Sequence, residues 1–550
     1  MKQQFLAVVL SAVLLAGCTS KPASTTTSST ASAAASTVDV QQDAAAVRAA
    51  NSNADAATLS TAGAKTITAT QGTVTISEAG TYRLTGTIDG QVVVDAGDAD
   101  VTLLLDNVTI TSTTSAAIAV TAAGEVAVVL ADGSTNTLSD TSSYAEDADV
   151  NAALYSAADL TIGGTGTLVV HGNGNDGITG KDDLTITGGT IEVTAADDGI
   201  RGKDALVVTG GAITVTAGGD GLTADNDEKA DAGYVDLRGG TVGITAGGDG
   251  VSAATDLVVT GGTVTVDAGS SNADTSKKGL KSGVVTVLEG GTITVTATDD
   301  AVHSDGAVHL HGAALTLSAG DDGVHAENAL LIDAGTVHVT RSYEGIESAD
   351  ITVSGGDTTI VSSDDGLNAS GNATTDTAGQ NQGGGRGGGE QVGPYKATIT
   401  GGTLTIDAEG DGFDSNGTAE ITGGTVVVNG PTRSGNGALD VNGSFTISGG
   451  ELVATGSAGM AVAPATDSAQ GWLSATFSGT VAAGTAIRIT AADGTEIATV
   501  TTTKAIQNLV YSSAKITSGT QYTVTAGSST SAVTAGQAPA GGGGFGGGRR

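Results

Sequence analysis

Asp176-Gly177-Ile178 opens a four-residue word (an acid, a glycine, an aliphatic residue and a variable residue) that recurs along the middle of the chain. The steps between first positions are 22, 22, 29, 29, 22, 22, 22, 21 and 46 residues. A fixed period of this size is typical of a solenoid. The step of 46 is either two periods or one period with a long insert. The later copies are Asp198-Gly199-Ile200, Asp220-Gly221-Leu222, Asp249-Gly250-Val251, Lys278-Gly279-Leu280, Asp300-Ala301-Val302, Asp322-Gly323-Val324, Glu344-Gly345-Ile346, Asp365-Gly366-Leu367 and Asp411-Gly412-Phe413.

Each period holds short alternating runs of Val, Ile, Leu and Thr, which is the pattern of β-strands rather than helices. A second marker, a Gly-Gly pair such as Gly188-Gly189 or Gly239-Gly240, precedes a strand in step with the first. Glycine suits a corner that needs a positive φ. Short strands and glycine corners in periods of about 22 residues predict an all-β fold, a single-stranded parallel β-helix.

Composition narrows the class of partner. The chain has 550 residues, 3% aromatic residues and a formal net charge of −37. Loss of Lys2 with a leader would make the charge −37 − 1 = −38. Such a charge repels nucleic acid, so we expect no nucleic-acid partner and favour cations, or ligands held through cations.

The first residues resemble a bacterial lipoprotein signal. Lys2 is followed by an apolar run, Phe5 to Leu15, and then by Leu15-Ala16-Gly17-Cys18. We therefore expect a signal peptide over 1–17, lipidation of Cys18, and an extracytoplasmic protein attached to the cell membrane only through this anchor. The alternative is an ordinary cleaved leader. Because Cys18 is the only cysteine, no disulfide can form within the chain.

The rest of the chain divides by composition. We expect a disordered Ser/Thr/Ala tether over 18–62, a β-helix over 63–465, a small antiparallel β unit over 470–535 and a disordered Gly-rich tail over 536–550. Inserts lie near 224–233, 270–276 and 368–395, the last of them expected to be mobile. All three are expected at one corner of the coil, where they would wall a binding face. A monomer is expected.

Residues one period apart should stack at about 4.8 Å, the spacing of neighbouring strands. Two charges at that distance repel by about 1 kcal/mol in water, or about 3.5 kcal/mol at an effective dielectric constant of 20. Oxygen ligands in such clusters suit Ca²⁺. The alternative is an ordinary Asp-Gly turn whose glycine has a positive φ, and we favour it for Asp176 and Asp411. The predicted calcium ligands are Asp197, Asp198, Asp220, Asp249, Asp299, Asp300, Asp321, Asp322, Glu344, Asp364 and Asp365.

The fourth position of the word should point outward, because the third points into the core. Several residues at this position are polar and lie beside the acids, so we expect them to bind a ligand. The alternative is that they simply face solvent. The histidines among them could also bind a transition metal. The predicted ligand-binding residues are Arg201, Lys281, His303, His325 and Glu347.

The order and spacing of these words, with Ala152-Ala153-Leu154-Tyr155-Ser156 before them, resemble a bacterial family of carbohydrate-binding β-helix proteins. The resemblance covers about Thr66 to Gly450. It implies a right-handed parallel β-helix related to polysaccharide lyases, with bound calcium and affinity for polysaccharides, including acidic, polygalacturonate-like ones. Lys277-Lys278 departs from the acidic column, although Lys278 could serve as an internal counter-ion.

Three functions remain open at this stage. The first is a non-catalytic, calcium-containing module that binds polysaccharide. The second is a calcium-dependent uronan lyase, which needs a base near the metal. The third is a structural stalk or adhesin. The residues placed to act as the lyase base are Arg201, Lys278, Lys281 and His303.

Overall fold

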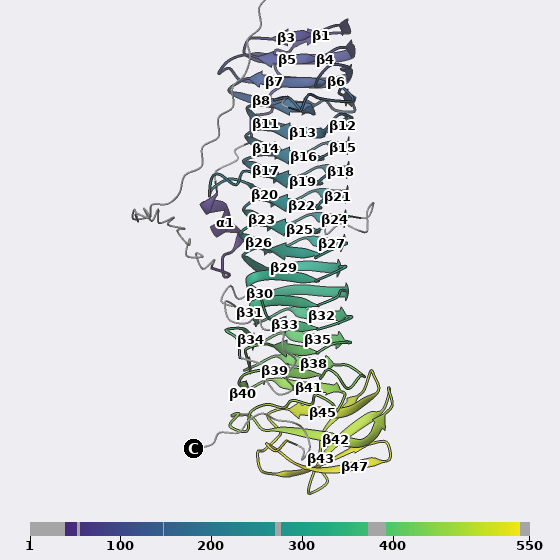
Figure 1. Ribbon diagram of the computed structural model, residues 1–550. Helices are drawn as coiled ribbons and strands as arrows, with labels where there is room; N and C mark the ends of the chain where they lie inside the picture. The colour runs from purple at the N-terminus through teal and green to yellow at the C-terminus, as the bar shows by residue number, and fades with distance from the viewer. Residues whose placement is uncertain (1–38, 52–55, 147, 270–276, 372–391, 539–550) are drawn as a thin grey trace, which may run out of the picture. The chain divides into compact units, whose positions relative to one another are not determined.

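The computed structural model describes residues 39–51, 56–146, 148–269, 277–371 and 392–538. The predicted signal peptide, Cys18, the insert 270–276, most of the insert 368–395 and the tail from residue 539 lie outside the described residues. The fold is a parallel β-helix followed by a small antiparallel sheet (Figure 1).

Each coil contributes one strand to each of three faces, and every strand pairs in parallel with its equivalents in the coils before and after. Face 1 follows the repeated word: β13 (Asp176–Gly180), β16 (Ile200–Gly202), β19 (Leu222–Ala224), β22 (Val251–Ala253), β25 (Leu280–Ser282), β28 (Val302–Ser304), the starts of β30 (Val324–Arg341) and β31 (Ile346–Val353), β33 (Leu367–Ala369), β36 (Phe413–Ser415) and β39 (Leu439–Val441).

Faces 2 and 3 follow in each coil. Face 2 contains β14 (Asp183–Ile186), β17 (Ala205–Val208), β20 (Tyr234–Leu237), β23 (Asp256–Val259), β26 (Val285–Leu288), the start of β29 (Ala307–Ser318), the middle of β30, the end of β31, β34 (Lys396–Ile399), β37 (Thr418–Ile421) and β40 (Phe445–Ile447). Face 3 contains β15 (Thr190–Ala195), β18 (Ala212–Ala217), β21 (Thr241–Ala246), β24 (Thr263–Ala268), β27 (Thr292–Ala297), the ends of β29 and β30, β32 (Asp357–Ser362), β35 (Thr403–Ala408), β38 (Thr425–Asn429) and β41 (Glu451–Gly456).

The looser strands at the N-terminal end are further coils, as expected. They are β1 (Lys65–Ile67), β2 (Thr70–Gln71), β3 (Val74–Ile76), β4 (Gly80–Asp89), β5 (Val92–Asp95), β6 (Val101–Thr111), β7 (Ile118–Ala122), β8 (Glu125–Leu130), β9 (Thr135–Ser139), β10 (Ala152–Ser156), β11 (Asp159–Gly164) and β12 (Thr167–Gly172).

The third position of the word forms a buried apolar column. Ile178 pairs with Ile200, and Ile200 pairs with Leu222, so residues 22 apart lie in register. Leu367 pairs directly with Phe413. The step of 413 − 367 = 46 residues is therefore a single coil with a long insert. These side chains are completely buried and belong to one continuous core.

The two glycine markers serve different purposes. The second glycine of each Gly-Gly pair has a positive φ, for example 95° at Gly189 and 87° at Gly240, as predicted for a corner. The glycine of the acid-glycine word has no positive φ, so the turn interpretation is wrong on this point. At Gly250 an added Cβ would lie 2.1 Å from Cγ1 of Val266 and 2.6 Å from the carbonyl oxygen of Gly279. Glycine is needed there because face 3 of the same coil packs directly against the backbone.

Strands from the C-terminal region close the end of the β-helix. β45 (Ile506–Ser512) pairs antiparallel with β41, and β42 (Trp472–Val481) pairs antiparallel with β45. Trp472 faces the core of the helix, while Leu473 faces a second core. A separate sheet of β43 (Ala486–Ala491), β44 (Glu496–Thr501), β46 (Gln521–Ala526) and β47 (Ser529–Thr534) contributes to that second core. The predicted antiparallel unit therefore caps the last coil.

A short helix, α1 (Ala44–Ala50), lies within the stretch that we expected to be a disordered tether, and it packs beside face 2 (Figure 1). Asp43 caps its first turn, and Ala44 and Val47 contact Val258 and Val285. The side chain of Arg48 forms two hydrogen bonds, of 2.6 and 2.8 Å, with the carboxylate of Asp236. These contacts order the segment although its composition resembles a linker. The described part of the chain holds no helix long and apolar enough to span a membrane.

The inserts do not share one corner. The insert 224–233 joins β19 to β20, and the insert 368–395 joins β33 to β34, so both lie between faces 1 and 2. The insert 270–276 instead connects β24 to β25, between faces 3 and 1. The sequence does not distinguish these two corners, because both lie within a few residues of the repeated word. Face 1 is therefore flanked by inserts on both sides.

Candidate functional site

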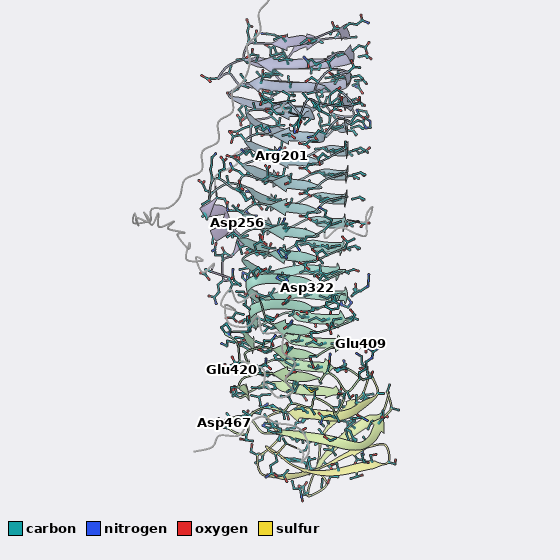
Figure 2. The ribbon with its side chains drawn as sticks, viewed as in Figure 1. Arg201, Asp256, Asp322, Glu409, Glu420 and Asp467 are labelled. Carbon is teal, nitrogen blue, oxygen red and sulfur yellow. The ribbon has the colours of Figure 1, made fainter. Side chains whose placement is uncertain are left out.

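The fourth position of the word forms an outward column along face 1, as predicted. The register pairs Arg201 with Thr223, Lys281 with His303, and His303 with His325. Figure 2 shows Arg201 and Asp322 along the strands of face 1, with Asp256 and Glu420 on the side of face 2. The full column is Thr179, Arg201, Thr223, Ser252, Lys281, His303, His325, Glu347, Asn368, Asp414 and Asp440.

The acids at the first position form a second column that has a structural role. Oδ1 of Asp198 accepts a hydrogen bond from the backbone N–H of Asp220 at 2.8 Å, and Oδ1 of Asp220 accepts one from Asp249 at 2.7 Å. Oδ1 of Asp249 likewise accepts from Lys278 at 2.9 Å. Each carboxylate thus satisfies an amide of the next coil, and an unsatisfied buried amide would be costly. One carboxylate oxygen of each such residue is then left for other partners.

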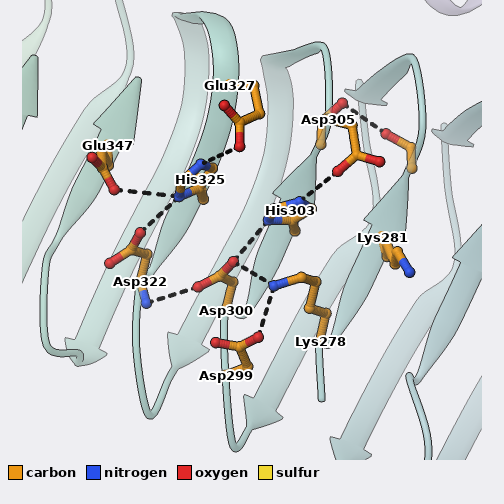
Figure 3. A network of polar contacts seen from close by, with 12 residues as sticks. Lys278, Lys281, Asp299, Asp300, His303, Asp305, Asp322, His325, Glu327 and Glu347 are labelled. Atoms are coloured by element: carbon orange, nitrogen blue, oxygen red, sulfur yellow. Dashed lines mark hydrogen bonds and ion pairs between the residues drawn. The ribbon is translucent and has the colours of Figure 1, made fainter. Parts of the chain in front are cut away.

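In the middle coils the second carboxylate oxygen is occupied by protein cations (Figure 3). Nζ of Lys278 lies 2.7 Å from Asp299 and 2.9 Å from Asp300, so this lysine is the internal counter-ion that we expected. Asp300 also contacts Nδ1 of His303 at 2.8 Å. Burial alone would raise the pKa of Asp300, but its bonds to His303 and the charge of Lys278 lower it to about 2.

The two histidines of the column stack on each other, with ring centroids 5.0 Å apart. Both nitrogens of His303 face carboxylates, Asp300 at 2.8 Å and Asp305 at 2.9 Å. Nδ1 of His325 lies 2.9 Å from Asp322 and 3.3 Å from Glu347. Burial opposes the charge, but these carboxylates raise the pKa of His325 to about 10. The centre of face 1 therefore carries basic side chains, each held in place by acids.

Further along the chain, face 1 carries acids for which the described residues provide no such cations. Burial and neighbouring acids raise the pKa of Glu344 to about 8, of Asp411 to about 7 and of Asp414 to about 8. Burial also raises the pKa of Asp365 to about 6. Lys504 forms ion pairs with Asp407 and Glu409, which precede Asp411 in the sequence, rather than with these acids.

Asn368 lies in the column between Glu347 and Asp414. Its side-chain amide nitrogen donates to Glu344 at 2.7 Å. Its carbonyl oxygen is buried and has no hydrogen-bond partner among the described residues. A buried amide oxygen in a residue that contacts a carboxylate is the kind of ligand that Ca²⁺ accepts.

The predicted calcium ligands thus fall into different environments. Asp198, Asp220 and Asp249 belong to the amide-bonded column, and Asp299, Asp300 and Asp322 contact Lys278 or His325. One oxygen each of Asp299, Asp300 and Asp321 lie within 4.8 Å of one another, as three metal ligands would. The remaining predicted ligands, Glu344, Asp364 and Asp365, lie toward the acidic end, and Asp197 is exposed.

The sequence analysis missed Asn368, Asp411, Asp414 and Asp440 as candidate ligands. The fourth position of the word could have found Asn368 and Asp414, once the step of 46 residues was read as one coil. Asp440 does not follow a recognisable copy of the word, because Gly437 occupies the first position, where the acid would be. Only the pairing of β36 with β39 places Asp440 in the column.

The residues proposed as a lyase base are all held by acids. Arg201 forms an ion pair with Asp225, and Lys281 lies 3.4 Å from Asp249. Lys278 and His303 contact Asp300 as described above. Burial opposes the charge of Arg201 and Lys278, but their partner carboxylates raise the pKa of both, whereas a general base must be uncharged before it can take a proton.

Comparison with known proteins gives a consistent family. Residues 70–323 match the family model described as "Carbohydrate-binding domain-containing protein". A protein of that name from Acetivibrio thermocellus is 43% identical over 128 residues, which are 22% of this chain and 45% of that relative. The chain thus matches less than half of the relative's length. A solved structure of a polysaccharide lyase-like protein from C. thermocellum, a gadolinium derivative, is 33% identical, with 43% of this chain and 86% of that chain covered and a TM-score of 0.35.

Proposed function

Because residues 70–323 match the model of a carbohydrate-binding domain-containing family, we propose that the chain is a non-catalytic module that binds acidic polysaccharide along face 1. The observation that carries the proposal is the outward column, in which Lys281, His303 and His325 stand on three successive strands. Arg201 lies in the same column three coils earlier, with Thr223 and Ser252 between it and Lys281. Basic side chains on a strongly acidic protein would attract the carboxylates of a uronate chain locally. The insert 224–233, between faces 1 and 2, would border that chain on one side.

We also propose that Ca²⁺ binds at the acidic end of face 1. The support is the group of acids with raised pKa values, Glu344, Asp365, Asp411 and Asp414, together with the buried carbonyl oxygen of Asn368. A divalent ion would offset the mutual repulsion of these acids and supply the missing partner of Asn368. Such an ion could bridge protein carboxylates to those of the polysaccharide.

The binding proposal is tested with polygalacturonate in affinity gels, with calcium and with chelator. Arg201→Ala and Lys281→Ala should each weaken binding by about tenfold, the effect of losing roughly 1.4 kcal/mol. Arg488→Ala, in the C-terminal sheet and exposed, is the matched control and should bind like the unaltered chain. Equal binding by all three variants would reject face 1 as the binding surface. Equal binding with calcium and chelator would reject calcium bridging.

A calcium-dependent lyase on the same face is the alternative. Its support is weaker, since each proposed base is paired with an acid. Formation of unsaturated product, followed by ultraviolet absorbance on several uronans with calcium, would establish a lyase. If neither binding nor product is found, a structural role as a stalk or adhesin gains support.

We propose further that the protein is exported and held at the cell surface by a lipid on Cys18. The support is the run Leu15-Ala16-Gly17-Cys18 after a short apolar stretch. Growth with labelled palmitate should label the protein, and Cys18→Ser should abolish the label. Equal labelling of the variant would contradict the anchor.

A further inference from the structure

A second group of histidines lies on face 2, apart from the polysaccharide column. His309 and His311 belong to β29, and Asp333 belongs to β30 in the next coil. Nε2 of His309 lies 3.1 Å from Oδ2 of Asp333, and Nδ1 of His311 lies 2.6 Å from Oδ1. One ligand atom from each residue lies within 4.8 Å of the other two. Two imidazoles and a carboxylate therefore converge on one point.

The orientation of His309 is set by the N-terminal segment. Its Nδ1 lies 2.9 Å from the backbone carbonyl oxygen of Gln42. Because a carbonyl oxygen only accepts, Nδ1 carries the hydrogen. The other nitrogen, Nε2, then has its lone pair directed toward a carboxylate oxygen of Asp333 at 3.1 Å, an arrangement in which a metal ion could bind both. Metal-binding histidines commonly donate their other N–H to a carbonyl in this way.

The surroundings of the cluster suit a cation. His309 is only 3% exposed, so it is held within the fold rather than lying loose on the surface. The carboxylate of Asp333 contacts His311 at 2.6 Å, and the charges of Glu289 and Asp43 act on the same imidazole. The two imidazoles thus lie among carboxylates, partly enclosed, next to the start of α1.

We propose that His309, His311 and Asp333 form a site for a divalent transition metal such as Zn²⁺, which fastens the segment Asp39–Asn51 to face 2 through Gln42. Imidazole ligands favour Zn²⁺, Cu²⁺ and Ni²⁺, whereas Ca²⁺ favours oxygen ligands alone. Around tetrahedral Zn²⁺ the ligand atoms would lie about 3.3 Å apart. The exposed ring of His311 has room to move outward by the few tenths of an ångström that this requires. A fourth position would be left for water.

The test is calorimetric titration of the full chain, stripped with chelator, with Zn²⁺ in the presence of excess calcium. Because His303 and His325 could take a second ion, the variants are designed to separate the two places. His311→Ala, at a half-exposed residue, should lose one equivalent of zinc, and it should lose the same equivalent in a His303→Ala background, where no ion can bind through His303. His338→Ala, at an exposed histidine on face 3, is the matched control. Full zinc binding by His311→Ala would overturn the proposal.

A second measurement follows the consequence for the segment. Zinc should slow hydrogen exchange of the amides of Ala44–Ala50 at least several-fold in the unaltered chain, because it holds His309 and thereby Gln42. It should have no such effect in His311→Ala. If zinc leaves the hydrogen-exchange rates of this segment unchanged in both proteins, the fastening role is rejected.

Discussion

At the scale of single residues, the acid column is explained first by hydrogen bonding and only then by charge. Asp220 accepts the backbone N–H of Asp249, and Asp198 does the same for Asp220. The cost is mutual repulsion: burial and the neighbouring charge of Asp249 raise the pKa of Asp220 to about 6. An asparagine could accept the same hydrogen bond without a charge.

This distinction gives the first prediction. Asp220→Ala should lower the free energy of unfolding by about 1–2 kcal/mol, because the amide of Asp249 loses its partner. Asp220→Asn should cost less than half as much at pH 8, since its carbonyl oxygen keeps the bond. Chemical denaturation measures both variants. If the asparagine variant is as unstable as the alanine variant, the charge itself is required and a bound cation at this coil becomes the better account.

Lys278 is the second test at this scale. Its ammonium contacts Asp299 and Asp300, whose side chains are only 12% and 5% exposed. Lys278→Ala should destabilise the chain by about 2–4 kcal/mol, because buried acids lose their cation. Calcium should restore part of the loss by binding Asp299, Asp300 and Asp321. Lys281→Ala, at a more exposed and longer contact, should cost under about 1 kcal/mol. A melting temperature unchanged in Lys278→Ala would contradict this role.

The stacking of residues one period apart was predictable, because one period makes one coil and neighbouring coils lie one strand spacing apart. The partners of those residues were not. That the second oxygen of Asp300 meets Lys278 and His303 depends on side-chain rotamers and on which corner carries the word. Likewise, the turn interpretation, which we favoured for Asp176 and Asp411, gave the glycine of the word a positive φ, whereas the structure shows that this glycine gives room to face 3.

At the scale of elements, α1 is the feature that sequence analysis missed. Its seven residues are too few for a periodic pattern, and its anchors lie far away in sequence: 188 residues separate Arg48 from Asp236. By contrast, the coils and the antiparallel cap were predictable because their signals repeat locally. Asp236 has a fully buried side chain and two arginine partners, Arg48 and Arg238.

The docking of α1 predicts an effect of Arg48. Arg48→Ala should speed hydrogen exchange of Ala44–Ala50 and reduce stability by about 1–3 kcal/mol, because Asp236 keeps only Arg238. Arg83→Ala, which removes a more exposed ion pair with Asp106, should leave exchange in this segment unchanged. Equal exchange in Arg48→Ala and the unaltered chain would show that the apolar contacts of Ala44 and Val47 suffice.

At the scale of the whole molecule, the sum of the acids predicts an unusual pH dependence. Glu344, Asp365, Asp411 and Asp414 have folded-state pKa values of about 8, 6, 7 and 8, above their ordinary values. Between the ordinary and the raised values the folded chain binds more protons than the unfolded chain. Stability should therefore fall as pH rises from about 4 to about 8, by up to about 1.4 kcal/mol per pH unit for each group.

Thermal melts in chelator measure this dependence. The melting temperature should be higher at pH 5 than at pH 8, and calcium should raise it most at pH 8, where the acids are ionised. Asp414→Asn should flatten the profile. A melting temperature that rises from pH 5 to pH 8 in chelator would contradict the raised pKa values. One that is indifferent to calcium at pH 8 would contradict the proposed ion.

Most of the fold, and the two columns of face 1, could thus be predicted from period and pattern alone. The division of face 1 into a centre with paired basic and acidic side chains and an end with acids alone among the described residues could not, because it depends on the coil of 46 residues being single and on the pairing of β36 with β39. Those two registers bring Asn368, Asp414 and Asp440 into line.

The central claim, that face 1 holds the polysaccharide, is tested most directly by hydrogen exchange on the full chain with calcium and oligogalacturonate. The account predicts slower exchange in face 1 strands, above all β16, β25 and β28, with faces 2 and 3 of the same coils unchanged. Protection confined to faces 2 or 3, or to the C-terminal sheet, would contradict it.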